Sequence, residues 1–237
     1  MDLTLRSTET ELMDAPDIGV ETLKMVFEDI NKTNRLLGGN AITVQKVMDW
    51  VYETKKESYT ILDAGCGDGN MLRALATAFR KAGIRGHFSG IELRDDIIEL
   101  AREKSLNFPE IAYQKGNIMH LNTENHSCDI VICTLTVHHF ENSSIPSLLK
   151  TMLGVAKIGV IINDLQRSRL ACMLFRLFSM MFMKTNVAKN DGLVSIKRAF
   201  KKSELIAFSK KIPGVMYEVK WKWAFRYVWT LQNQRPN

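Results

Sequence analysis

The feature that most constrains the fold is a glycine-rich loop between a short apolar run and an amphipathic helical pattern. Residues 59–63 (YTILD) are rich in β-forming side chains, and Gly65, Gly67 and Gly69 follow at alternate positions. Residues 70–81 then carry apolar side chains at helical spacing. Because glycine lets the backbone turn tightly and approach a ligand, the pattern predicts a strand, a ligand-binding turn and a helix.

Strand-like and helix-like patterns alternate after this loop. Residues 129–133 form an unbroken apolar run, typical of a parallel strand buried on both faces. Further strands are predicted at 87–91, 111–114 and 158–162, and helices at 95–104 and 145–156. This spacing predicts an α/β fold with an open, mostly parallel sheet and helices on both faces. The patterns then predict helices at 168–185 and 202–210 and two final strands, at 217–220 and 224–229, that could form a hairpin.

The alternation also divides the chain. Residues 1–56 carry helical patterns ahead of the first strand, and we expect a helical cap there. Residues 57–237 are expected to form the main domain. Within it, residues 168–200 are expected to be an apolar, helical lid inserted before strand six.

Three features are expected at the carboxyl ends of the first three strands, where ligands of such sheets bind. The first is the glycine loop, in which Asn70 stands where a dinucleotide-binding loop has its third glycine, so NAD and FAD are disfavoured. The second is Glu92, whose carboxylate at the end of a strand can accept both ribose hydroxyl protons. The third is Asn117 with Ile118, which could meet the edge and face of an adenine ring.

Residues 61–69 (ILDAGCGDG) resemble the first motif of the class I S-adenosylmethionine-dependent methyltransferases. Residues 90–93 (GIEL) are similar to the second motif, and Asn117 stands where the family usually has Asp. The resemblance implies a Rossmann-like, seven-stranded sheet with the last strand antiparallel. It also implies S-adenosylmethionine as cofactor and S-adenosylhomocysteine as product. The cofactor-binding residues expected on this basis are Asp63, Gly65, Cys66, Gly67, Gly69, Glu92, Leu93, Asn117, Ile118 and Thr134.

The reacting groups are expected after strands four and five, close to the methyl group of the cofactor. His138 and His139 follow strand four, and histidine titrates near neutral pH, which suits a base for a phenolic hydroxyl. One of the pair is therefore the expected catalytic base, and the alternative is that both only hold the turn. Asp164 could orient a histidine or bind the acceptor, but it could equally pair with Arg167 or Arg169 or cap the next helix.

A second resemblance concerns the acceptor. Residues 34–39 (NRLLGG) and 163–168 (NDLQRS) are similar to those of bacterial small-molecule methyltransferases that often accompany polyketide or quinone-like pathways. This implies O-methylation of a phenolic or polyketide acceptor. A stripe of Leu, Met and Phe side chains over residues 170–182 is either core or the wall for a hydrophobic acceptor, because Met adapts to irregular apolar ligands. The expected substrate-binding residues are Arg35, Asp164, Met173 and Leu177.

Three other functions remain open at the level of sequence. They are a nucleic-acid or protein methyltransferase, a non-catalytic partner protein that kept the fold, and a nicotinamide-dependent oxidoreductase. The first is disfavoured because the chain has no Asn-Pro-Pro-Tyr motif and no Pro-Cys pair. Residues 220–227 (KWKWAFRY) could stack on bases, but their alternation indicates a strand with one buried face.

Composition adds expectations about partners and compartment. The net charge of +6 suits an anionic partner, but the basic residues are spread along the chain. Four cysteines without a C-x-x-C pair predict reduced thiols and no metal site, and the N-terminus does not resemble a signal peptide. We therefore expect a cytoplasmic monomer or homodimer that takes a small-molecule acceptor and binds no nucleic acid. Weak contact with a membrane surface is possible, since Arg169, Arg176 and Lys184 flank the apolar stripe.

Overall fold

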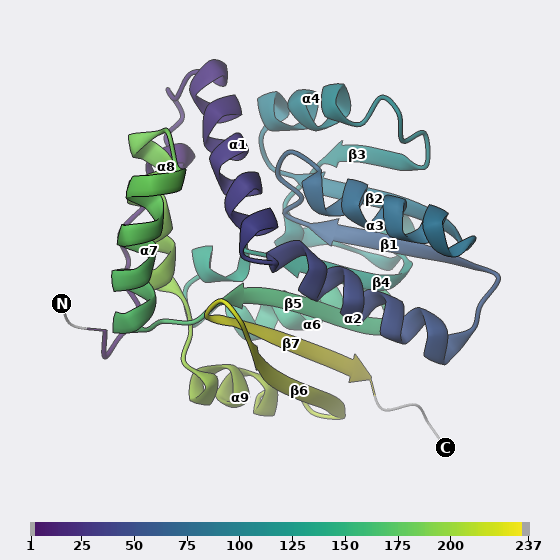
Figure 1. Cartoon of the computed structure of the whole chain (residues 1–237). Helices are drawn as coiled ribbons and strands as arrows, with labels where there is room; N and C mark the ends of the chain where they lie inside the picture. Colours follow the sequence, from purple (N-terminus) through teal and green to yellow (C-terminus); the bar gives the residue numbers. More distant parts are fainter. Residues whose placement is uncertain (1–2, 234–237) are drawn as a thin grey trace.

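The centre of the molecule is a sheet that contains seven strands over residues 3–233, the part of the chain that the computed structural model describes. The strands are β1 (Ser58–Ala64), β2 (Arg85–Glu92), β3 (Ile111–Lys115), β4 (Cys128–Thr134), β5 (Ala156–Leu165), β6 (Val215–Lys222) and β7 (Arg226–Asn233). Their order is β3-β2-β1-β4-β5-β7-β6, and β7 runs antiparallel to both of its neighbours (Figure 1). The predicted Rossmann-like sheet with an antiparallel last strand is confirmed.

Helices connect the strands and cover both faces of the sheet. They are α1 (Val20–Leu36), α2 (Gly39–Thr54), α3 (Asn70–Ala82), α4 (Asp95–Lys104), α5 (Thr123–His126), α6 (Ile145–Val155), α7 (Arg169–Phe182), α8 (Asn186–Arg198) and α9 (Lys202–Lys210). Short 3-10 turns occur at η1 (Leu12–Asp14), η2 (Ile118–His120) and η3 (Val137–His139).

Two hydrophobic cores lie on the two faces of the sheet, and β4 contributes to both. Ile130 and Ile132 point to the side covered by α2, α3 and α4, whereas Val131 and Cys133 point to the side covered by α6 and α9. This alternation follows from the period-two geometry of a strand, and it explains why the fully buried strand is an unbroken apolar run.

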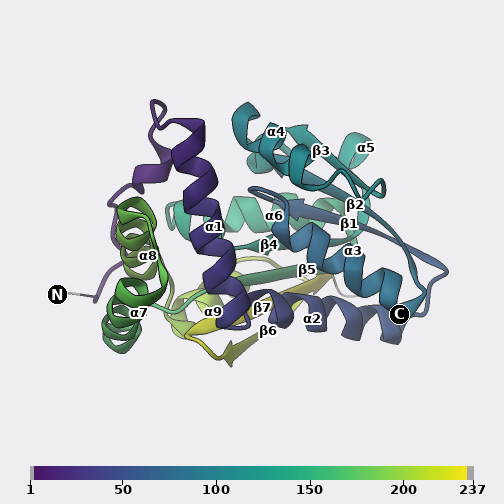
Figure 2. The ribbon, with the colours of Figure 1, turned by 45° about the horizontal axis from the view of Figure 1, so that its top comes forward.

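A third layer lies beyond the carboxyl ends of the parallel strands. There α1 lies beside α7 and α8 (Figures 1 and 2), and Val26 of α1 packs with Met183 and Ala188. The helical cap and the helical insertion that the sequence predicts therefore meet at one end of the sheet. Within residues 3–233, the helices lack the length and apolar character that crossing a bilayer requires.

Two local predictions were wrong. Helix α8 was missed because Gly192 interrupts its pattern, but a Cβ at Gly192 would lie 2.1 Å from the ring of Phe175, so packing against α7 requires glycine. Residues 220–227 do not form one strand with a buried face. They span the end of β6, a turn and the start of β7, and Trp221 and Trp223 are both exposed.

Candidate active site

The glycine loop between β1 and α3 needs glycine for both conformation and space. Gly65, Gly67 and Gly69 have φ of +81°, +50° and +76°, in the left-handed region that other residues rarely adopt. A Cβ at Gly65 would lie 2.5 Å from a side-chain carbon of Thr136, and one at Gly67 would lie 2.9 Å from the ring of Phe27. The loop therefore presents backbone to the cavity beside it.

Glu92 lies at the end of β2 with its carboxylate turned back toward this loop. The amide of Gly67 donates to Oε2 at 3.2 Å, and the amide of Leu93 donates to Oε1 at 2.7 Å. Both bonds hold the carboxylate on the cavity wall. The amide of Arg94 also donates to Oε1, at 3.3 Å. A carboxylate has about four acceptor sites, so Glu92 keeps capacity to accept from a hydroxyl group of a ligand.

Asp63, near the end of β1, is a buried acid without a visible partner. Among the described residues nothing hydrogen-bonds its Oδ1, although the side chain lines the same cavity. Burial, together with the charge of Glu92, raises the pKa of Asp63 well above its usual range. A cationic ligand group beside Asp63 would favour its ionised form and supply the missing partner. The ammonium and sulfonium groups of S-adenosylmethionine fit this requirement.

These residues belong to one cavity of about 770 Å³ at the carboxyl ends of the parallel strands. It continues from the glycine loop to an apolar region walled by α1, α7 and α8. Eleven of the sequence-predicted residues line it: Asp63, Gly65, Cys66, Gly67, Glu92, Leu93, Asn117, Ile118, Thr134, His138 and His139. Gly69 shapes the loop from outside the wall, where a Cβ would lie 2.0 Å from the hydroxyl of Tyr113.

None of the four predicted substrate-binding residues lies on this wall. Arg35 is exposed near the end of α1, and Asp164 is buried against His138. Met173 and Leu177 are 54% and 52% exposed, on the outer face of α7. These two side chains lie away from the cavity because α7 is apolar on both sides. The exposure of most of the stripe contradicts its interpretation as core. The residues of α7 that line the cavity are Ala171, Leu174, Phe175 and Phe178.

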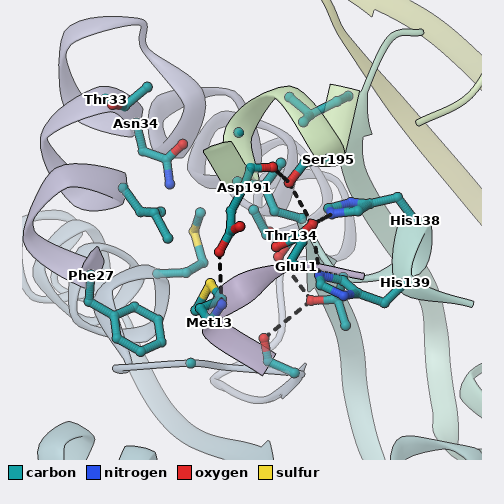
Figure 3. A pocket seen from close by; sticks show the side chains of 18 of the residues that line it. Glu11, Met13, Phe27, Thr33, Asn34, Thr134, His138, His139, Asp191 and Ser195 are labelled. Carbon is teal, nitrogen blue, oxygen red and sulfur yellow. Dashed lines mark hydrogen bonds and ion pairs between the residues drawn. The ribbon is translucent and has the colours of Figure 1, made fainter. Parts of the chain in front are cut away.

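His138 is buried between two carboxylates. Its Nδ1 lies 2.7 Å from Asp164 Oδ1. On the other side of the ring, Nε2 lies 3.3 Å from Glu11 Oε1, as Figure 3 shows. Burial alone would lower the pKa of His138, but the charges and hydrogen bonds of Asp164 and Glu11 raise it to about 9. His138 is therefore protonated at neutral pH with both ring nitrogens engaged. This arrangement contradicts the hypothesis that His138 is the base and agrees with the alternative that it holds the turn.

His139 is the more accessible histidine. Its side chain is 28% exposed and lines the cavity. Nδ1 lies 3.3 Å from Asp14 Oδ2, and Nε2 lies 3.8 Å from Glu11 Oε1. The two carboxylates can orient the ring and stabilise it when it takes up a proton.

Glu11, from the N-terminal segment, belongs to this cluster but was not predicted from the sequence. Burial acts to raise the pKa of Glu11, but the hydrogen bond and charge of His138 outweigh burial and lower it to about 2. Ser195 of α8 also donates to Glu11, at 2.7 Å (Figure 3). Asp191 fixes the segment by accepting from the amides of Leu12 and Met13, at 2.8 and 2.9 Å. No motif or periodicity marks a lone acid in such a segment, so only the fold reveals it.

Glu11, His138 and His139 are also a candidate set of metal ligands within the described part of the chain. Their ligand atoms lie within 4.8 Å of one another. Ligands about 2.1 Å from a tetrahedral metal would be only about 3.4 Å apart. The proton that His138 holds already balances one of the two carboxylates, so ion pairing accounts for the arrangement.

Comparison with known proteins places this geometry in a family. A family model described as a methyltransferase domain matches residues 61–159, which include the glycine loop, Glu92, Asn117 and both histidines. Residues 61–159 therefore carry a methyltransferase domain, and the chain is a methyltransferase. The cavity wall formed by the glycine loop, Asp63 and Glu92 fits S-adenosylmethionine as methyl donor and S-adenosylhomocysteine as product. A demethylmenaquinone methyltransferase of Staphylococcus aureus (strain MRSA252) is 25% identical to this methyltransferase over 169 residues, 69% of the chain and 68% of the relative.

Solved structures share the fold at low sequence identity. The plantazolicin methyltransferase BamL, in complex with a triazolic desmethylPZN analog and S-adenosylhomocysteine, has a TM-score of 0.66 at 14% identity, covering 91% of each chain. The magnesium protoporphyrin IX methyltransferase ChlM of Synechocystis PCC 6803, with bound S-adenosylhomocysteine, has a TM-score of 0.56 at 16% identity, covering 82% of this chain and 84% of that one.

Proposed function

We propose that the chain transfers a methyl group to a hydroxyl oxygen of a small, hydrophobic acceptor of phenolic or polyketide type. The observation that carries the proposal is the apolar part of the cavity, which brings Leu174, Phe175 and Phe178 of α7 to the same space as His139. Apolar walls with few polar groups are typical of small-molecule sites. The demethylmenaquinone methyltransferase relative, whose name specifies a quinone-type compound, supports an acceptor of this size and polarity.

The residues around the glycine loop would bind the cofactor. Glu92 would accept from a ribose hydroxyl, Asp63 would pair with a cationic group, and Asn117 and Ile118 would meet the adenine ring. Cys66, Leu93 and Thr134 lie on the same wall. The cofactor supplies an electrophilic methyl group on a sulfonium. The protein has to exclude water and align the acceptor oxygen with that methyl, since effective concentration and orientation account for much of such a rate.

His139 is the base in this proposal. His139 would accept the proton of the acceptor hydroxyl as the acceptor oxygen takes the methyl group. The S–CH3 bond would break and leave the neutral thioether S-adenosylhomocysteine, while Glu11 and Asp14 would stabilise the imidazolium. His138 is a positioning residue that holds Glu11 beside His139. We infer that residues 1–56 act as the cap of the site, and that residues 168–200, which include α7 and α8, act as its lid.

We also propose a cytoplasmic location for this protein. All four cysteines are free and buried, which supports a reducing, cytoplasmic location. We propose a monomer or homodimer that acts without nucleic acid, because the cavity walls are mainly apolar and aromatic rather than basic.

A labelled methyl-transfer assay tests the proposed acceptor. The purified chain receives S-adenosylmethionine with a ¹³C-methyl group and is offered alkylated phenols and quinols, total RNA or protein extract. We expect label on the oxygen of a phenol or quinol, identified by its carbon chemical shift. Label on a ring carbon would overturn O-methylation, and label only in RNA or protein would overturn the small acceptor. Cofactor binding without any transfer would favour a non-catalytic partner protein.

A further inference from the structure

The outer face of α7 is an apolar surface that nothing in the described chain covers. Leu170, Met173, Leu174, Leu177, Met180, Met181 and Phe182 are all exposed, and Met181 reaches 77%. They recur at helical spacing along one side of the helix, while Ala171, Cys172 and Ser179 face inward. An amphipathic helix that turns its apolar side to solvent lacks a partner, and a contiguous apolar patch of this kind marks an interaction site.

The charge around this face has one sign. Residues 169–190 contain four basic side chains and no acidic one. Arg169, Arg176 and Lys184 are exposed, and Lys189 is half-buried. Lys32 of α1 adds a cation at the end of α7, where its Nζ donates to the carbonyl of Phe182 at 2.9 Å. Apolar side chains flanked by basic ones are the pattern of helices that lie in the surface of an anionic bilayer.

The exposed face and the cavity are two sides of the same helix. Phe175 and Phe178 line the cavity from the inner side, and Leu174 both lines the cavity and is 36% exposed. The β6–β7 turn lies next to α7, because Phe225 packs against the cluster that contains Ala171 and Cys172. Trp223 in this turn is also exposed and lines the cavity. Tryptophan is enriched at the boundary between lipid and water.

We propose that the outer face of α7 docks on an anionic lipid surface, and that the acceptor is an amphiphile which enters the cavity from that surface. The part about the acceptor rests on the proposed function, whereas the docking does not. A second copy of the chain is a less suitable occupant of this face. A two-fold axis would bring Arg169 and Arg176 of both copies together, and residues 169–190 contain no acid to balance their charges. A surface of anionic phospholipid headgroups balances these charges and accepts the apolar side chains between them.

Vesicle co-sedimentation tests the docking with matched variants. The probes are vesicles of phosphatidylcholine alone and vesicles that also contain phosphatidylglycerol. We expect the wild-type chain to partition about ten-fold more strongly onto the phosphatidylglycerol vesicles, because each basic residue near such a surface adds attraction. Met181→Asp should reduce that partition about ten-fold, since it removes an exposed apolar side chain that would insert into the bilayer and replaces it with a negative charge.

Leu106→Asp is the matched control. Leu106 is 81% exposed and lies between α4 and β3, away from α7 (Figure 1). Leu106→Asp therefore changes the net charge and the exposed apolar area in the same way as Met181→Asp, but at a distance from the proposed docking face. Its partition should stay within about two-fold of wild type. The double variant Arg169→Gln, Arg176→Gln should lose the preference for phosphatidylglycerol while keeping residual binding. Calorimetric titration with S-adenosylhomocysteine, expected to be the same in all these chains, reports that they are folded.

Three outcomes would overturn the proposal: equal partition onto both kinds of vesicle, equal losses for Met181→Asp and Leu106→Asp, or a wild-type dimer in light scattering that Met181→Asp converts to a monomer. The last would assign the face to a second copy of the chain. Because co-sedimentation needs neither acceptor nor turnover, its failure leaves the proposed methyl transfer untouched. Docking without transfer to any phenol or quinol would contradict the proposed function and not the docking.

Discussion

In the proposed function, the loop glycines shape the cofactor half of the site, His139 is the base and His138 is a positioning residue. Each loop glycine combines a left-handed backbone with a neighbour too close for a Cβ, and Asp63 and Glu92 supply acids on either side of the loop. The sequence predicted all of these residues because a strand, glycines and an acid at the next strand end leave a spacing signature. It could not separate His138 from His139, since their roles depend on Glu11, Asp14 and Asp164, which come from other parts of the chain.

Gly67→Arg should abolish cofactor binding. Any side chain at this position combines a strained φ of +50° with a clash against Phe27, and arginine would extend into the cavity. Titration with S-adenosylhomocysteine should show at least a 100-fold loss of affinity, equivalent to about 2.7 kcal/mol. Gly154→Ala is the control, because Gly154 lies in α6 with open space around its Cβ position. It should bind normally and gain about 0.5–1 kcal/mol of stability. Normal affinity of Gly67→Arg for S-adenosylhomocysteine would contradict the assignment of the glycine loop to cofactor binding.

The two histidines should differ when they are replaced. His139→Gln should slow methyl transfer by about 100-fold, the size of a lost general base, and leave S-adenosylhomocysteine affinity within about two-fold. The pH–rate profile should lose the limb that reports a base. His138→Gln should instead lower the free energy of unfolding by about 3 kcal/mol, because it leaves two buried carboxylates without their cation. Full turnover by His139→Gln would rule out that residue as the base.

Helices α1, α7 and α8, at the carboxyl end of the sheet, wall the apolar part of the cavity, which we propose binds the acceptor. Asp29 of α1 is buried and accepts from the amides of Lys184 and Thr185, at 2.8 to 3.0 Å, and from the hydroxyl of Thr185, which caps α8. The strands and most helices were predictable from periodicity. The face of α7 that lines the cavity was not, because a helix with apolar residues on both sides gives no sequence signal for its inner side.

Asp29→Ala should loosen the link between the cap and the lid. The substitution removes the acceptor of three backbone and side-chain donors at the start of α8, and we expect a loss of about 2 kcal/mol in urea unfolding. Hydrogen exchange should increase in α8 before it increases in the sheet. Glu28→Ala is a suitable control, since Glu28 is the exposed neighbour on the same helix. Similar effects of both substitutions would contradict this role for Asp29.

At the scale of the whole molecule, arginine side chains from distant segments donate hydrogen bonds to the backbone that carries the two histidines. Arg6 donates to the carbonyls of His138 and Phe140 at 2.7 and 2.9 Å, and Arg198 donates to the carbonyl of His139 at 2.7 Å. The N-terminal segment, η3 and α8 thus form one cluster around Glu11 and His138. Sequence patterns describe neighbours along the chain, so they predicted the sheet but not this cluster.

This cluster should make stability depend on pH. The pKa of His138 is about 9, above its ordinary 6.5, so its contribution is complete below about pH 6.5 and is lost as the pH rises through 9. The pKa of Glu11 is about 2, below its ordinary 4.5, so its contribution is complete above about pH 4.5 and is lost as the pH falls toward 2. Urea unfolding should therefore show maximal stability between these limits, with a loss of roughly 3 kcal/mol by pH 9.5. If the His138→Gln variant lost as much stability between neutral pH and pH 9.5, the loss could not come from deprotonation of His138.

Isothermal titration of the purified chain with S-adenosylhomocysteine tests the central claim most directly, because every role assigned to Asp63, Glu92 and the loop requires this ligand. We expect one-to-one binding with measurable heat, weakened by Glu92→Ala, and no heat with NADH. Heat with NADH and none with S-adenosylhomocysteine would contradict the account.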